Sequence, residues 1–187
     1  GLWVLQSAAL QLRLWENDPG TARLHLAVNI SPKQFHQPDF TEQVRRIVNE
    51  FQIKPGRLKL ELTESMVLMN VDSTVQKMTE LRKSGISFSM DDFGTGHTTL
   101  AYLKHLPLDQ IKIDESFIQD SIKDERDAMI VRAIIGMAEN MGFEVIAEGV
   151  ETEQQKEFLK LNGCPRFQGF LLGRPMPIEE LEIQIKQ

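Results

Sequence analysis

The sequence has few of the residues that build disulfides or zinc sites. It contains one cysteine, Cys164, which excludes an internal disulfide and a zinc site made of several cysteines. Cys164 lies in GCPRFQG, a turn that leads into an apolar run, and we interpret it as a small buried hydrophobic residue. The four histidines show no ligand spacing such as HxxxH and are interpreted as ordinary residues: His25, His36, His97 and His105.

Basic charge and long apolar runs are also scarce. Lys and Arg total 21 against 27 Asp and Glu, a net charge of −6, so the composition indicates no basic surface for a DNA or RNA duplex or an anionic membrane. No apolar run approaches the roughly 18 residues that a membrane span requires, and we therefore expect a soluble domain without direct membrane insertion. The acidic excess suits a protein that holds cations with its carboxylates.

Short apolar runs alternate with helical patterns along the chain. Apolar residues at helical spacing predict helices over 40–51, 75–81, 128–141 and 153–162. No linker, repeat or low-complexity tract divides the alternation, which predicts one α/β domain with a parallel sheet, either doubly wound or closed into a barrel. The strand-like runs begin at Leu24, Arg57, Ile86, Leu108, Glu144 and Arg166.

A complete (β/α)₈ barrel typically needs about 250 residues, so 187 residues with about six strands would lack about two βα units. The chain opens without a methionine inside an apolar stretch, and the predicted helix over 1–15 would then be the tail of a missing unit. The sequence therefore has the character of a piece of something longer.

Polar residues stand at or near the ends of five strand-like runs. The carboxyl ends of parallel strands in a barrel meet on one face, where the active site lies. Carboxylates are costly to bury unpaired, so their repetition at strand ends is informative. Such oxygen donors suit Mg²⁺ or Mn²⁺, and adjacent carboxylates can hold two ions of the kind that assist in-line attack on phosphate. The residues are Asn29, Glu61, Asp91, Asp92, Lys112 and Glu148.

Each part of this pattern also has a purely structural explanation. DDFGTG can be a turn, and Glu61 and Glu64 can favour the first turn of a following helix through its dipole. Lys112 can be a snorkelling edge residue, and Asn29 before Ser31 is better explained, in isolation, as a cap or turn. Acids at the ends of four different strands favour the functional interpretation, because the structural one would have to act independently each time.

Six short motifs stand in the order found in one protein family. They are NIS from Asn29, ELTES from Glu61, DDFGTG from Asp91, KID from Lys112, AEGVET from Ala147 and QGF from Gln168. Over residues 1–175 the chain resembles EAL domains, the bacterial phosphodiesterases that linearise cyclic di-GMP to pGpG. The resemblance implies a TIM-type (β/α)₈ barrel, and residues 1–187 would form an EAL-type phosphodiesterase domain that lacks its first strands. The EAL motif, with its metal-binding glutamate and a nearby phosphate-binding arginine, would lie in the missing part.

The resemblance also implies a site for two Mg²⁺ or Mn²⁺ ions. Asn29, Glu61 and Asp91 resemble ligands of the first ion. Asp91 resembles the bridging carboxylate, and Asp92 and Glu148 complete the second ion's ligands. The family's two ions bridge a water and lower its pKa for attack on the phosphodiester.

Further roles follow from the same resemblance. Lys112 resembles the amine that orients the attacking water, and Gln168 resembles the amide that supports the metal-bound water, so the implied catalytic residues are Lys112, Glu148 and Gln168. Glu64 resembles the carboxylate that braces the DDFGTG loop, and Glu151 is assigned to substrate contact or support of the ligands. The loop residues are Phe93, Gly94, Thr95 and Gly96.

The resemblance also implies a ligand, an oligomeric state, further domains and a location. We expect cyclic di-GMP as ligand, a homodimer through the DDFGTG-loop side, and an upstream sensory or GGDEF-type domain. The implied location is cytoplasmic, with membrane attachment of the parent protein compatible with the resemblance. The alternative is an inactive EAL module that binds cyclic di-GMP as a receptor or mediates protein contacts, but the metal-binding acids visible here favour the enzyme.

Two places depart from the family's pattern. His97, Thr98 and Thr99 replace the tyrosine and serines usual after DDFGTG, and the threonines keep the hydroxyls. Pro165 replaces the usual acid after GC. We expect His97 to influence the position of the loop or dimerisation.

Overall fold

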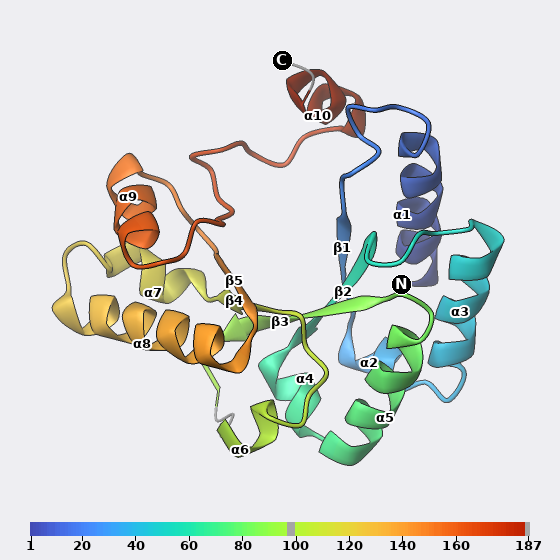
Figure 1. Cartoon of the computed structure of the whole chain (residues 1–187), viewed down its shortest axis with the longest axis horizontal. Coiled ribbons are helices and arrows are strands. Elements are labelled where there is room, and N and C mark those ends of the chain that lie inside the picture. Colours follow the sequence, from blue (N-terminus) through green and yellow to red (C-terminus); the bar gives the residue numbers. More distant parts are fainter. Residues whose placement is uncertain (97–99, 186–187) are drawn as a thin grey trace. The chain divides into compact units, whose positions relative to one another are not determined.

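A computed structural model describes residues 1–96 and 100–185 (Figure 1). The departures from the family's pattern at His97, Thr98 and Thr99 therefore lie outside the described residues. The chain forms two compact units. Unit 1 comprises Gly1–Leu62, Asn70–Phe88 and Pro175–Gln187, and unit 2 comprises Thr63–Met69 and Ser89–Arg174.

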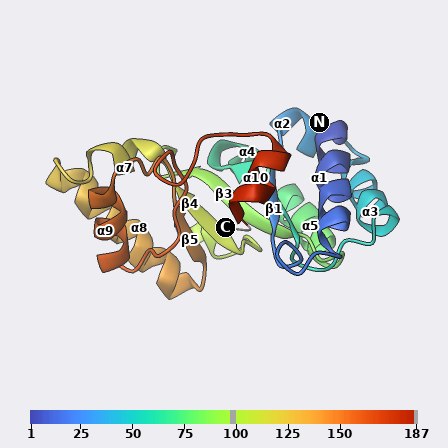
Figure 2. The same ribbon diagram turned by 90° about the horizontal axis from the view of Figure 1, so that it is seen from above.

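Unit 1 combines parallel strands with helices that bury one apolar face. Helices α1 and α3 lie side by side in both views of the ribbon (Figures 1 and 2). On α1 the buried residues Leu5, Ala9, Leu12 and Trp15 recur at helical spacing, as expected for an amphipathic helix. The elements are α1 (Leu2–Trp15), β1 (Leu26–Asn29), α2 (Pro32–Phe35), α3 (Phe40–Glu50), β2 (Leu58–Thr63, ending in unit 2), α5 (Val71–Arg82) and α10 (Ile178–Ile185).

Unit 2 holds most of β3 and all of β4 and β5, which pair in parallel in chain order. Helix α8 packs against β4, β5 and α7. Every residue of β4 is buried, as expected for a strand covered on both faces. The elements are α4 (Glu64–Leu68), β3 (Ser87–Phe93, beginning in unit 1), α6 (Leu100–Leu103), β4 (Gln110–Ile113), α7 (Glu115–Asp120), α8 (Glu125–Met141), β5 (Glu144–Ala147) and α9 (Glu153–Leu161).

The predicted helices are confirmed with small changes of their ends. The helices expected over 128–141 and 75–81 start earlier, at Glu125 and Val71, because Asp124 and Asn70 cap them with their side chains. Helix α8 ends at Met141 and is followed by the capping residue Gly142, whose φ of 78° is the left-handed conformation that favours glycine at this position. The α/β class with parallel strands is confirmed as well.

The prediction of a strand from Arg166 is wrong. Residues 166–168 hydrogen-bond with Ala147 and Val150, but only an isolated bridge between Ala147 and Phe167 results. The chain then turns, and the amides of Leu172 and Gly173 donate to the carbonyl of Gly169. The described residues therefore contain five named strands rather than about six.

None of the described helices combines the length and apolar character that crossing a membrane requires.

Candidate metal centre

Asp91 and Asp92 lie inside β3, although the sequence predicts that they follow a strand ending at Met90. Pairing with β4 continues to Phe93 across a register shift between Met90 and Phe93. Asp92 has a φ of 54°, which non-glycine residues adopt rarely. Such irregularities redirect side chains and occur often beside active sites.

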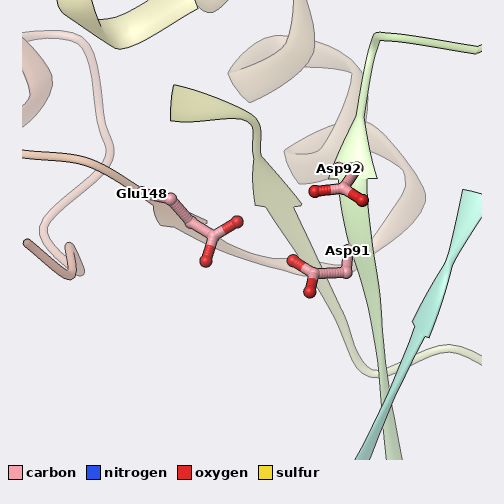
Figure 3. A group of neighbouring side chains, drawn as sticks. All are labelled: Asp91, Asp92 and Glu148. Atoms are coloured by element: carbon pink, nitrogen blue, oxygen red, sulfur yellow. The ribbon is translucent and has the colours of Figure 1, made fainter. Parts of the chain in front are cut away.

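Glu148, the residue that directly follows β5, approaches these two acids. One carboxylate oxygen from each of Asp91, Asp92 and Glu148 lies within 4.8 Å of the others. Figure 3 shows the carboxylates of Asp91 and Glu148 pointing toward each other, from β3 and from the end of β5. Three carboxylates from two strand ends therefore meet, as the sequence predicts for a parallel sheet.

Lys112 lies in β4, between β3 and β5, and its ammonium neutralises part of the carboxylates' charge. Its side chain is almost fully buried, and its Nζ lies 2.9 Å from Asp91 Oδ1 and 2.7 Å from Glu148 Oε1. In the sheet, Lys112 is the register partner of Ile146, two residues before Glu148. A buried ammonium needs such partners, since an unpaired charge in the interior is very costly.

The protonation of the cluster reflects burial and crowding of like charges. Burial raises the pKa of Glu148 to about 7, although Lys112 favours its ionised form. Burial, followed by the charges of Asp91 and Asp114, also raises the pKa of Asp92. Glu148 and Asp92 therefore hold a proton more readily than exposed carboxyl groups do.

The donor set fits a divalent cation. Asp91 Oδ1 is buried and has Lys112 Nζ as its near partner, at 2.9 Å, so this oxygen already lies where a cation is favoured. Three carboxylates with oxygens so close together are hard ligands of the type that Mg²⁺ and Mn²⁺ prefer.

The cluster opens into a cavity of about 330 Å³ within unit 2. Two further predicted residues line it, Glu151 and Gln168. Sequence reasoning did not assign the other five lining residues to the site. Among these, Asp114 and Glu115 directly follow β4, and Phe170 belongs to the QGF motif. The full lining is Asp91, Asp92, Asp114, Glu115, Glu148, Gly149, Glu151, Gln168, Gly169 and Phe170.

Glu64 contacts the DDFGTG loop directly. Its Oε2 accepts hydrogen bonds of 3.2 Å from the amides of Gly94 and Gly96. A Cβ at Gly96 would lie 2.6 Å from Glu64 Oε1, so this close approach favours glycine. The loop is also closed by Thr95, whose hydroxyl donates to the carbonyl of Asp92 at 2.9 Å, while the Phe93 side chain is buried.

Asn29 and Glu61 belong to unit 1, where they are register partners. Asn29 is the last residue of β1, whereas Glu61 lies inside β2, two residues before its end. Glu61 is buried and Asn29 is exposed. The structural role considered for the NIS motif is filled by Ser31, which caps α2 in a capping box with Gln34. Asn29 itself is a strand residue, so its side chain is not needed as the cap.

The structure is an α/β domain with parallel strands and a cluster of carboxylates, suited to a divalent cation, beside the carboxyl ends of β3 and β5. A family model described as EAL domain matches residues 1–175, so the chain belongs to the EAL family. The match covers nearly the whole chain.

Named relatives agree with this assignment. The chain is 44% identical over 181 residues to MucR of Pseudomonas aeruginosa, described as a bifunctional diguanylate cyclase/cyclic di-GMP phosphodiesterase; the alignment covers 97% of this chain and 26% of MucR. A solved structure of the PaMucR phosphodiesterase in a c-di-GMP complex matches with a TM-score of 0.92 and 44% identity, over 97% of this chain and 73% of that one. The EAL domain of Mycobacterium smegmatis DcpA matches with a TM-score of 0.92 and 38% identity, over 98% and 82% of the two chains. The chain spans about a quarter of the length of the curated relatives it matches.

Proposed function

We propose that residues 1–187 belong to the phosphodiesterase domain of a signalling protein, and that this domain, completed by its first strands, hydrolyses cyclic di-GMP to linear pGpG. The observation that carries this proposal is the meeting of Asp91, Asp92 and Glu148 around the buried Lys112. The similarity to MucR and to the PaMucR phosphodiesterase, solved with c-di-GMP, supports the choice of substrate.

The cofactors proposed are two Mg²⁺ or Mn²⁺ ions. By the family resemblance, Asn29, Glu61 and Asp91 would hold the first, and Asp91, Asp92 and Glu148 would hold the second. When bound, these ions activate water near neutral pH and neutralise the phosphodiester. The preference for Mg²⁺ or Mn²⁺ follows from the carboxylate and amide oxygens of the set.

The chain's own residues position the reactants. Lys112, held between Asp91 and Glu148, orients the attacking water with its ammonium and adds positive charge where negative charge develops. The Gln168 amide lines the same cavity and supports that water by hydrogen bonding, while Glu151 contacts substrate or supports the ligands.

Glu64 has a positioning role in this proposal. By accepting from the amides of Gly94 and Gly96, it holds the loop that follows Asp91 and Asp92. The loop residues Phe93, Gly94, Thr95 and Gly96 are thereby fixed relative to the acids of β3.

The proposed setting is that of a signalling module. A homodimer forms through the DDFGTG-loop side, a sensory or GGDEF-type domain precedes the phosphodiesterase domain, and the site faces the cytoplasm. That the chain matches 22–26% of the length of curated relatives supports the presence of other domains in proteins of this kind.

Chromatography of cyclic di-GMP and pGpG tests the function in the protein as the cell makes it. We expect turnover with Mg²⁺ or Mn²⁺, loss with EDTA, and inhibition by excess Ca²⁺, which favours six to eight loosely arranged oxygens. Asp91→Asn should abolish turnover with the fold intact, because the bridging ligand keeps its shape and loses its charge. The exposed Asp72, in the first turn of α5, gives the matched control Asp72→Asn, which should keep full activity.

Three results would contradict the proposal. Equal turnover with EDTA would remove the metal requirement, and near wild-type rates in Asp91→Asn would remove the bridging assignment. Tight binding of cyclic di-GMP without cleavage in Mg²⁺ and Mn²⁺ would favour the receptor alternative.

A further inference from the structure

Phe170 is a large aromatic side chain that stays half-exposed beside the acidic cluster. It is 49% exposed and lines the same cavity as Asp91, Asp92 and Glu148. The guanidinium carbon of Arg174 lies 4.2 Å from the centre of its ring, which is a close cation–π contact. Phe170 therefore combines a cation over its ring with about half of its surface exposed, part of it toward the cavity.

The backbone on both sides of Phe170 is firmly held. The amide of Val150 donates to the Gln168 carbonyl, and the amide of Leu171 donates to the Val150 carbonyl. Between them Gly169 approaches so closely that a Cβ there would lie 2.2 Å from the Val150 carbonyl oxygen. Phe170 therefore projects from a segment pinned to the end of β5, and little freedom is lost when a ligand contacts it.

We infer that Phe170, backed by Arg174, is the platform on which one base of the cyclic dinucleotide stacks. This inference rests on the proposed function, because that function supplies the ligand. A cyclic dinucleotide has flat aromatic bases joined to anionic phosphodiesters. Phe170 offers its ring to a base, while Arg174, stacked on that ring, places positive charge near a cavity whose lining includes six carboxylates.

Stacking predicts a particular kind of contribution. Every base has a π face, so a phenylalanine platform supplies affinity and orientation rather than a choice between bases. The effect should appear in substrate binding and leave the chemical step nearly unchanged, because the ring lies beside the reacting groups and contacts a part of the ligand that does not react.

Affinity measurements on ring variants test the inference. Cyclic di-GMP binding is measured calorimetrically with Ca²⁺ in place of Mg²⁺ to prevent turnover. Phe170→Ala should weaken binding about 5- to 140-fold, the equivalent of about 1–3 kcal/mol for a lost base stack. Phe170→Trp should retain affinity and Phe170→Leu should not, since leucine keeps apolar volume without a π face. Leu172→Ala, at a neighbouring residue that is 52% exposed, is the matched control and should stay within about twofold of wild type.

A spectroscopic signature separates stacking from a merely structural role. A cyclic dinucleotide with 2-aminopurine in place of one guanine should lose fluorescence on binding to wild type, because its base stacks on the ring. That quenching should disappear in Phe170→Leu at saturating ligand.

The outcomes distinguish this inference from the function on which it rests. If wild type binds cyclic di-GMP and Phe170→Ala binds as tightly, or if quenching persists in Phe170→Leu, the inference that a base stacks on Phe170 is wrong and the proposed function is unaffected. If wild type binds no cyclic di-GMP, the proposed function is wrong, and so is the stacking inference that rests on it.

Discussion

Metal binding should depend steeply on pH near neutrality because a proton competes for Glu148. Its pKa is raised to about 7, first by burial. A carboxylate must be ionised to hold a metal ion. With that pKa about 90% of Glu148 is ionised at pH 8 and about 10% at pH 6, so the affinity for Mn²⁺ should fall about tenfold between them.

Titration calorimetry with Mn²⁺ from pH 6 to pH 8, in buffers that do not chelate the ion, measures this slope. Asp92, whose pKa is also raised, adds to the slope in the same direction. Glu148→Gln should weaken binding and remove most of the dependence on pH, because the amide does not titrate. Asp72→Asn, at an exposed acid on α5 outside the cluster, is the control and should keep the slope. Equal affinities at pH 6 and pH 8 would refute the reasoning.

The same shift affects the stability of the metal-free protein, with a sign that can be checked. The folded-state pKa of Glu148, about 7, lies above its ordinary value of 4.5, so the folded state holds the proton more tightly than the unfolded state. The free energy of unfolding should therefore fall as pH rises from 4.5 to 7, by at most about 3 kcal/mol. Urea unfolding of wild type and Glu148→Gln in EDTA measures it, and identical pH profiles would contradict the shift.

Three further changes act through other contacts of the structure. Lys112→Met should destabilise the metal-free protein by about 3–5 kcal/mol in urea unfolding, because it removes the cation between two largely buried carboxylates. Mn²⁺ should then stabilise the variant more than wild type. Equal stabilisation by Mn²⁺ would contradict a metal site formed by the carboxylates that Lys112 contacts. Gly169→Ala should lower the melting temperature because its Cβ would meet the Val150 backbone, whereas Gly136→Ala, with open space around it on α8, should raise stability by about 0.5–1 kcal/mol. Arg57→Gln should lower the free energy of unfolding in urea by about 2–4 kcal/mol, since the buried guanidinium donates to carbonyls of the loop before β1. Arg45→Gln, at an exposed ion pair, should lower it by less than about 1 kcal/mol. Similar losses in the two variants would contradict the stabilising role assigned to the buried Arg57.

The parts of the site that lie at strand ends could be predicted from the sequence. Buried apolar runs followed by Asp91, Lys112 and Glu148 indicate parallel strands whose carboxyl ends share an edge, and the structure places these three side chains in contact. The pairing itself depends on register, since Lys112 stands opposite Ile146 and so reaches Glu148 two residues later. No local pattern encodes that register.

Other features depend on tertiary contacts that the sequence pattern does not reveal. Asp91 and Asp92 remain within β3 because pairing with β4 continues past a register shift. The apolar run from Arg166 has the composition of a strand, but it turns at Gly169 and makes only one bridge. The proximity of Phe170 to the acids follows from that turn and could not be predicted from a run assigned as a regular strand.

Crystals of the protein grown with Mn²⁺ and cyclic di-GMP, with data collected at the manganese absorption edge, would reveal whether the carboxylates of the cluster bind two ions. We expect anomalous peaks of two ions with Asp91 bridging them and with Asp92 and Glu148 as further ligands. Peaks that involve none of these carboxylates, or their absence at saturating Mn²⁺ with Lys112 still paired to Asp91 and Glu148, would contradict this expectation.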